Sequence, residues 1–490
     1  MTTETLPTAS IPTRSSAPSP SPRQRLVLPG LMFIALVTTA IGSLGAPLLP
    51  TIGDEFHVSV GTSQWALTIS LLAGAIAAPI LGRLSDGGRR KEVIAVALVL
   101  VGLGCALAAI PLGFGWFLAG RALQGVGLGL VPLVISVARV ALPKEKTTGG
   151  IALLGVTTVA GLGIGYPLAG LVVQFYSVST AFWAGAVITA LAIVAAVLIV
   201  PTSIPVPHAR LDLLGVVLLG IAVAGLLLVC AEGADWGWAS ARLLGCLAIG
   251  VVAAVLWVIR ELRAAAPLVN LRLLAHPSVL AADVMVVLVG AGIYPLLSLV
   301  VRYVQAPTST GYGYGYPAAI AGLMLLPYSF GSFAASRIVQ KLLKRYSLEV
   351  LVVLSSIVLV LSMVLFLFTR EHLIPLLVAM TLAGLGTGAV FAINPAQINA
   401  GVPAHETGSA NSFYQVLRYI GYSLGTALSA TFLVGTIPRG GSLPTDTGYG
   451  LAAAFAIVVL LVAAVAAVLL SRHSKHASAS LVETTVAITE

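Results

Sequence analysis

The sequence predicts an all-α integral membrane protein with about fourteen transmembrane helices: two six-helix pseudo-repeat bundles plus two inserted helices. Of its 490 residues, 58% are hydrophobic and only 9% are charged, which excludes an ordinary soluble enzyme. Apolar stretches of about 20 residues, the length that crosses the hydrocarbon core, recur between short polar breaks. Because lipid offers the backbone no hydrogen bonds, helices are the expected spanning elements.

The expected spans lie between two polar tails. Residues 1–25 are rich in Ser, Thr and Pro and lack the apolar core of a cleavable signal, so a disordered cytoplasmic tail is expected there. A second cytoplasmic tail is expected at residues 472–490. The predicted helices cover residues 26–49, 63–82, 92–111, 115–138, 149–174, 180–200, 212–231, 243–259, 278–302, 317–336, 349–369, 373–394, 407–435 and 449–471.

Two basic loops, at residues 82–92 and 336–348, take equivalent positions when the seventh and eighth helices are set aside. This predicts an N-terminal six-helix bundle at 26–200, a linker with two inserted helices at 201–265 and a C-terminal bundle at 266–471. A binding site is then expected between the halves near the membrane midplane.

The basic residues predict the orientation. With the amino terminus inside, 20 of the 26 Lys and Arg residues are cytoplasmic, 4 are exterior and 2 lie within spans. Short cytoplasmic loops retain positive charge, so both termini are expected to be cytoplasmic, in a multi-pass protein of the cytoplasmic (inner) membrane. The same distribution explains the net charge of +9 without nucleic acid. The three cysteines, all in apolar stretches, imply neither a disulfide framework nor a metal site.

The loop GRLSDGGRRKEV follows the second predicted helix. It resembles the G-x-L-x-D-R-x-G-R-K loop of the major facilitator superfamily, although Gly87 and Arg89 depart from that pattern. A carboxylate among guanidinium groups can form an ion-pair latch that breaks as the halves move. The alternative is positive-inside charge alone. The predicted latch comprises Gly82, Asp86, Arg89, Arg90 and Lys91.

Arg121 lies in the fourth helix, about 10 Å into the membrane at ~1.5 Å per residue. An ionised residue at the centre of a span costs at least ~2.5 kcal/mol, so Arg121 is expected to face a cavity or a partner rather than to snorkel. Gln124 shares its face. The run R-A-L-Q-G-V-G resembles the superfamily's R-x-x-Q-G-x-G, and the resemblance implies that Arg121 takes part in proton coupling.

The fifth helix, GVTTVAGLGIGYPLAG, is dense in small residues. Glycine lets helices approach closely and proline bends them, so close packing alone is one explanation. The segment also resembles the G-x-x-x-G-P-x-x-G-G pattern of the superfamily's exporters, with Tyr166 and Ala169 as departures. The expected exporter-motif residues are Gly161, Gly165, Pro167 and Gly170.

The thirteenth helix carries a polar stripe around a central arginine. Asn411, Gln415, Arg418 and Tyr422 are spaced by four, three and four residues and therefore share one helical face. Such a stripe is expected to line a substrate cavity, together with Gln124. A structural hydrogen-bond network between helices is the alternative.

The proton carrier is not where the superfamily often keeps it, because the first helix, LVTTAIGSLGAPLLP, has no acidic residue. Asp283, about 8 Å inside the ninth helix, is the candidate in the membrane, unless it pairs with an arginine. Glu232 and Asp235 are weaker candidates for the proton carrier, because they lie at the exterior end of the seventh helix, where water reaches them. The exterior loop GYGYGYP, residues 311–317, is expected to be an interfacial anchor or a mobile gate.

The resemblance extends over nearly the whole chain and is closest to the fourteen-span drug:proton antiporters. It implies alternating-access export of amphiphilic organic compounds (drugs, antibiotics or secondary metabolites) in exchange for protons. A small-molecule substrate, protons and the lipid bilayer are the expected partners of a monomer without cofactors. The alternatives are a proton-coupled importer or uniporter of a small solute, or a transport-inactive membrane sensor on the same fold. The sequence contains no nucleotide loop or nucleophile elbow that would indicate an enzyme.

Overall fold

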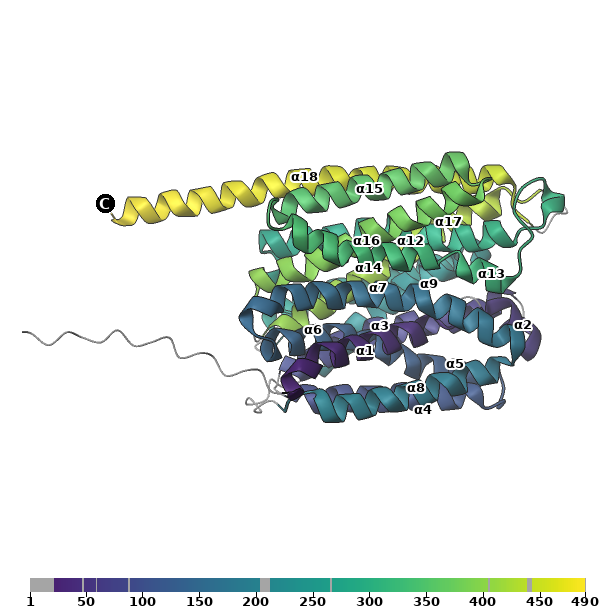
Figure 1. Ribbon diagram of the computed structural model, residues 1–490, viewed down its shortest axis with the longest axis horizontal. Coiled ribbons are helices and arrows are strands. Elements are labelled where there is room, and N and C mark those ends of the chain that lie inside the picture. The colour runs from purple at the N-terminus through teal and green to yellow at the C-terminus, as the bar shows by residue number, and fades with distance from the viewer. Residues whose placement is uncertain are drawn as a thin grey trace, which may run out of the picture.

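A computed structural model describes residues 22–45, 48–58, 60–86, 89–202, 212–264, 267–403, 406–438 and 443–489. These residues form helices and short connections, with no β-strand among them. The long helices run side by side in one bundle (Figure 1). The helices up to residue 199 are α1 (Pro22–Ser43), α2 (Leu49–Phe56), α3 (Val60–Asp86), α4 (Arg90–Ala109), α5 (Phe114–Gly125), η1 (Val126–Gly129), α6 (Leu130–Ala141), α7 (Lys144–Phe175) and α8 (Val178–Ile199).

The remaining helices follow residue 212. They are α9 (Leu213–Trp236), α10 (Ala241–Arg263), α11 (Leu271–Leu274), α12 (Pro277–Gln305), η2 (Thr308–Thr310), α13 (Ala318–Leu323), α14 (Leu326–Leu342), α15 (Leu348–Thr369), α16 (Leu373–Gly401), α17 (Thr407–Gly435) and α18 (Asp446–Thr489).

The observed helices follow the expected ones closely, with three interruptions. α1 ends at Ser43 rather than near residue 49, and Pro50 stands in the first turn of the separate helix α2, a position that proline favours. The fourth expected helix is divided by the 3-10 turn η1, and the tenth is divided between α13 and α14.

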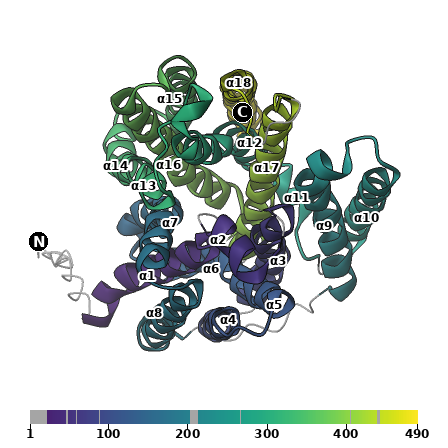
Figure 2. The same ribbon diagram turned by 90° about the vertical axis from the view of Figure 1, so that its right-hand side faces the viewer.

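Twelve helices in the described part of the chain are long and apolar enough to cross a membrane, so the expected number of fourteen is not confirmed. The two other long helices are α7 and α17, with 32 and 29 residues. Polar side chains, those of the predicted stripe included, lower the hydropathy of α17. Both helices nevertheless lie inside the bundle (Figure 2).

Two groups of helices pack around separate hydrophobic cores. One core is formed by buried residues between Val27 and Val200, and the other mainly by residues from Leu219 to Ala467. The groups meet along two seams: α3 and α6 contact α17, and α7 contacts α14 and α16. We call these groups the N-terminal and C-terminal halves, and the division at residues 200 and 266 stays a prediction.

Helices α9 and α10 stand at the side of the bundle (Figure 2). α9 contacts α3 of one half and α17 of the other. The start of α9 is tied to the end of α10, because Arg260 Nε donates to Asp212 Oδ2 at 3.0 Å. On α10, the Trp257 ring stacks on the Phe413 ring of α17 at 5.7 Å. The pair therefore covers one of the two seams.

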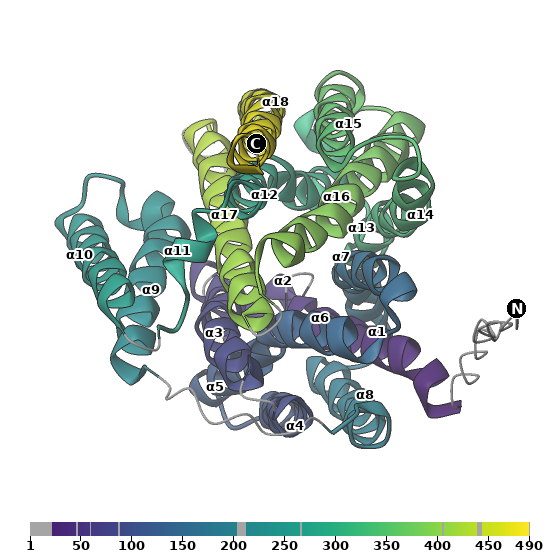
Figure 3. The same cartoon turned by 90° about the vertical axis from the view of Figure 1, so that its left-hand side faces the viewer.

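α1 begins at the same end of the bundle at which α18 extends beyond its neighbours (Figures 1 and 3). We call this the terminal end and the other the opposite end. α18 continues as a helix to Thr489, through the stretch expected to be a tail. The cytoplasmic location of the terminal end stays a prediction.

The Gly-Tyr loop lies at the opposite end. Gly311, Gly313 and Gly315 have φ of 82°, 79° and 64°, a left-handed conformation that suits glycine. Tyr314 Oη donates to the Arg370 carbonyl at 3.0 Å, and Tyr312 Oη to the Pro444 carbonyl. The loop thus fastens the α12–α13 connection to neighbouring turns of the C-terminal half.

Candidate functional site

A cavity of about 160 Å³ lies between the halves and is walled by α1, α3, η1, α9, α12 and α17. Its residues come from the last turns of α1, the first half of α3 and the last turns of α9, so it lies toward the opposite end. The lining residues are Thr39, Gly42, Ser43, Leu67, Thr68, Leu71, Leu128, Cys230, Ala231, Tyr294, Arg418, Tyr419, Tyr422, Ser423, Thr426, Ala427 and Ala430.

Arg418 is the charged residue of this cavity, although only 3% of its surface is exposed. Its guanidinium carbon lies 5.0 Å from the centre of the Phe391 ring and 5.9 Å from that of Tyr422. Within the described chain its Nε has no hydrogen-bond partner, and no carboxylate forms an ion pair with it. Each facing aromatic ring contributes about 2 kcal/mol in a desolvated site, but the rings carry no net charge. They do not neutralise the charge.

The stripe on α17 divides between two spaces. Arg418 and Tyr422 line the cavity, whereas Asn411, Gln415 and again Arg418 line a smaller pocket of about 10 Å³. Gln415 Nε2 donates to Tyr419 Oη at 2.7 Å, and Asn411 Nδ2 donates to Asn399 Oδ1 at 2.8 Å. The sequence left two alternatives for this stripe, residues that line a cavity or a hydrogen-bond network between helices. The helix has both.

Tyr419 also connects the two halves. Its hydroxyl donates to the carbonyl oxygen of Leu128 in η1 at 3.2 Å. On the cavity wall, Tyr422 stacks on Tyr294 of α12 with ring centres 4.1 Å apart and planes 10° apart. Aromatic side chains thus supply much of the rigid surface around Arg418.

Arg121 is fully buried and does not line the cavity. Nε donates to the Ala66 carbonyl of α3 at 3.0 Å, Nη2 to the Gly42 carbonyl of α1 at 3.2 Å, and Nη1 to Gln124 Oε1 at 2.6 Å. Gln124 Nε2 donates in turn to the Gly104 carbonyl of α4 at 3.0 Å. No described carboxylate forms an ion pair with Arg121. In this conformation Arg121 and Gln124 tie α1, α3, α4 and α5 together.

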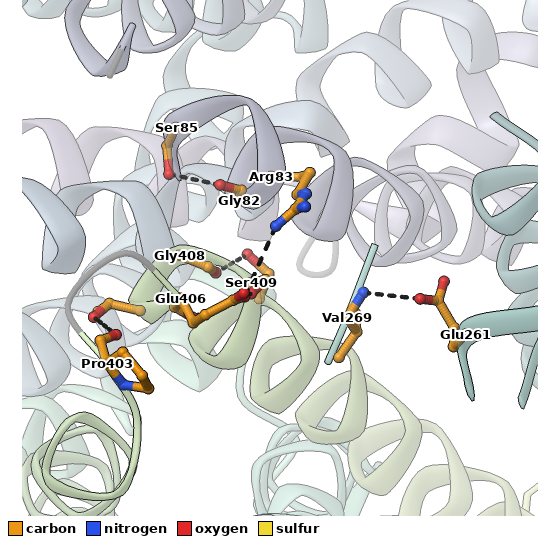
Figure 4. Close-up of polar contacts among 11 residues, drawn as sticks. Gly82, Arg83, Ser85, Glu261, Val269, Pro403, Glu406, Gly408 and Ser409 are labelled. Atoms are coloured by element: carbon orange, nitrogen blue, oxygen red, sulfur yellow. Dashed lines mark hydrogen bonds and ion pairs between the residues drawn. The ribbon is translucent and has the colours of Figure 1, made fainter. Parts of the chain in front are cut away.

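The terminal end of the seam between α3 and α17 is closed by contacts across the halves (Figure 4). Arg83 Nη1 lies 3.8 Å from Glu406 Oε2, and Ser409 Oγ donates to the same carboxylate at 3.0 Å. Gly82 packs so closely on α17 that a Cβ there would collide with the Ser412 side chain and the Gly408 carbonyl. Gly82 and its neighbour Arg83 thus join α3 to α17 here, and their action as a latch stays a prediction.

Arg139 on α6 adds a second contact across the halves. Its guanidinium donates to the Thr407 hydroxyl and, at 3.3 Å, to the Val402 carbonyl. Arg83, Arg139 and Glu406 are not among the residues predicted from the sequence. A signal was present, because Glu406 is an acid just before a polar helix and both arginines stand at the same predicted membrane face.

The other predicted latch residues lie elsewhere. Arg90 Nε donates to Ser136 Oγ of α6 at 3.1 Å, within the N-terminal half. Arg89 is exposed at the start of α4, and Lys91 is half-buried in its first turn. Asp86 ends α3, and its side chain lies outside the described residues. Their part in the latch stays a prediction.

The glycines of α7 pack on α1. A Cβ at Gly161 would lie 3.0 Å from the Leu36 carbonyl oxygen, and one at Gly165 would lie 2.9 Å from that of Ala40. Gly170 is buried, and the Pro167 side chain is outside the described residues. Since α7 also contacts α14 and α16, it packs against helices of both halves.

Asp283 is 5% exposed on α12, and its Oδ1 has no hydrogen-bond partner in the described chain. It forms no ion pair there, so the alternative of a fixed arginine partner is not observed. Beside it, Asn394 Nδ2 of α16 donates to the Ala282 carbonyl at 3.1 Å. Glu232 follows the cavity residue Ala231 and is half-buried, and the Asp235 side chain is not described.

Comparisons with known proteins agree with this arrangement. The chain is 26% identical to the uncharacterized MFS-type transporter YhcA of Bacillus subtilis (strain 168) over 413 residues, 83% of this chain and 75% of that one. It is 26% identical to the puromycin resistance protein pur8 of Streptomyces alboniger over 480 residues, 94% of each chain.

Among solved structures, the human organic anion transporter MFSD10 (TETRAN) superposes with a TM-score of 0.63 at 17% identity, covering 91% of this chain and all of that one. At this identity the likeness concerns the fold. Residues 31–426 match the Major Facilitator Superfamily. With its two helical halves and its cavity between them, this multi-pass membrane protein belongs to the Major Facilitator Superfamily of transporters.

Proposed function

We propose that this transporter exports amphiphilic organic compounds in exchange for protons by alternating access. The observation that carries the proposal is the cavity between the halves, sealed at the terminal end by Arg83–Glu406 and Arg139–Thr407. If the terminal end is cytoplasmic, this conformation faces outward. Rocking of the halves about the seams would open the terminal end to substrate.

The direction of transport rests on two further points. A relative similar along 94% of the chain is named a puromycin resistance protein, which favours efflux of antibiotics or other drugs. The second point is the resemblance of the α7 segment to the pattern of the superfamily's exporters. On this proposal the protein works as a monomer in the inner membrane with both termini in the cytoplasm.

Asp283 is the proposed proton carrier. It is a buried carboxyl with an unpartnered oxygen, located on a helix that also lines the cavity. A group of this kind can gain and lose a proton without breaking a fixed ion pair. Arg121, held by carbonyls of α1 and α3, would support coupling by holding the N-terminal half rigid.

Everted membrane vesicles test the proposal. Dye accumulation in respiring vesicles is expected to collapse when a protonophore is added. Asp283→Asn is expected to lose uphill accumulation and to retain dye-for-dye exchange, because the cavity does not contain Asp283. Asp54→Asn, at an exposed position of α2, is the matched control.

Two results would contradict the proposal. Accumulation that persists after the proton gradient is abolished would exclude proton exchange. Protonophore-sensitive accumulation of normal size in Asp283→Asn would move the proton to another residue.

A further inference from the structure

We propose that Arg418 binds an anionic group of the substrate, so that the cavity selects amphiphiles that bear a carboxylate, sulfonate or similar acid. The inference rests on the proposed function only in taking this cavity as the substrate site. It concerns the chemical class of ligand, and not the driving force of transport.

The first argument is charge. Among the described residues that line the cavity, Arg418 is the charged one and none is acidic. Glu232 follows Ala231 on α9 but is not among the lining residues, and Asp283 lies on α12 outside the cavity. An organic cation in this space would therefore face a buried guanidinium without a carboxylate beside it, whereas an anion would find its counter-charge.

The second argument is hydrogen bonding. Thr39, Ser43 and Thr426 donate their hydroxyl protons to carbonyls of their own helices. Arg418 Nε has no hydrogen-bond partner among the described residues, although only 3% of the surface of Arg418 is exposed. Buried polar groups are nearly always paired, and a guanidinium presents donors in the planar fork that suits carboxylates and sulfonates. Nε itself has less than 1 Å² of accessible surface, so a ligand acceptor would reach this unfilled donor once the Arg418 side chain moves toward the cavity that it lines.

The third argument is the surface around that donor. The Tyr294–Tyr422 stack and the Leu67, Leu71 and Leu128 side chains form an aromatic and aliphatic wall beside Arg418. This wall suits the apolar body of an amphiphile, while the guanidinium takes its acidic end. One cavity thus provides both parts of the recognition.

A matched pair of dyes tests the inference. The anionic dye 8-anilinonaphthalene-1-sulfonate and the neutral N-phenyl-1-naphthylamine share their ring system and differ by the sulfonate. With purified full-length protein in lipid nanodiscs, and empty nanodiscs subtracted, Arg418→Gln is expected to weaken sulfonate binding about tenfold or more. Binding of the neutral dye is expected to stay within about twofold. Arg418→Lys, which keeps the charge without the fork, should recover part of the loss. Arg345→Gln, at an exposed position, is the control.

Other outcomes overturn the inference. The first is that Arg418→Gln weakens the binding of both dyes equally. The second is that the sulfonate does not bind the wild type saturably. The third is that ethidium binds more tightly than the sulfonate and that its binding depends on Glu232. If Arg418→Gln does not fold, thermal unfolding of the wild type with each dye still tests the inference. The sulfonate should raise the unfolding midpoint of the wild type more than the neutral dye does, and the reverse order would contradict the inference. Binding is measured without a proton gradient, so a failure of proton-driven export in vesicles is a separate result.

Discussion

At the scale of residues, the two arginines within spans, Arg121 and Arg418, have different surroundings in the structure. Both are buried, and neither forms an ion pair with a described carboxylate. Arg121 is surrounded by carbonyl oxygens of α1 and α3 and by Gln124, whereas Arg418 lies among aromatic rings beside a cavity. The first arrangement suits a structural clamp and the second suits a binding group.

The clamp predicts that Arg121→Lys fails even though the charge is kept. The planar guanidinium of Arg121 donates to carbonyl oxygens of α1, α3 and Gln124 at once, whereas a single lysine ammonium cannot reach all three. In Arg121→Lys, two or more buried carbonyls therefore lose their hydrogen-bond donor. We expect a loss of about 3 kcal/mol in stability and loss of dye efflux. Thermal unfolding of the purified protein and vesicle transport measure these effects. Arg345→Lys should behave as wild type, and a fully active, equally stable Arg121→Lys would refute the clamp.

At the scale of elements, α3 and α17 approach each other closely at the terminal end. Gly82 leaves no room for a side chain against Gly408 and Ser412. Gly82→Ala is therefore expected to hold the terminal end open and to depopulate the conformation in which the cavity faces the opposite end.

Cys230 reports on this equilibrium because it lines the cavity from α9. With Cys105 and Cys246 replaced by alanine, an impermeant maleimide added outside right-side-out vesicles should label Cys230 several-fold more slowly in Gly82→Ala. Gly115→Ala, where a Cβ would meet no atom within 4 Å, is the matched control. An unchanged labelling rate in Gly82→Ala would show that this contact does not control closure.

Cys230 also shows that α9 lines the cavity, which the sequence of this helix did not predict. The inserted pair α9–α10 covers the seam between α3 and α17 and supplies part of the cavity wall. The pair expected to be an insertion thus contributes to the cavity through α9.

At the scale of the whole molecule, the halves are held together at the terminal end by a small number of polar contacts. Arg83 and Glu406 keep 10% and 15% of their side-chain surface exposed, so their ion pair is partly screened. A contact of this strength can stabilise one state and still break in each transport cycle.

We expect Glu406→Gln to shift the equilibrium between the two states by up to ~1 kcal/mol, about a fivefold change in population. Slower Cys230 labelling from outside would measure the shift. Exchanging the charges in Arg83→Glu with Glu406→Arg should restore part of the labelling rate. If the exchange behaves like the sum of the single variants, the two residues do not interact in the membrane.

The sequence by itself determined much of the plan. Hydropathy is a property of each segment, so the positions of the long helices follow from it, and α17 begins and ends where its polar stripe and flanking residues predict. The same segments predicted that Arg121, Arg418 and Asp283 would lie within spans, and all three are buried in the structure. The count was less secure, because α17 carries so many polar groups that it is not among the twelve helices that meet the apolar criterion.

Only the tertiary structure decided which of these residues meet. Arg83 and Glu406 are more than 300 positions apart in the chain, and Cys230 joins the cavity from α9. Such contacts depend on how each helix is rotated and how closely it approaches its neighbours, which segment hydropathy does not encode. For the same reason the sequence marked both buried arginines alike, and only packing placed carbonyl oxygens around Arg121 and an open cavity beside Arg418.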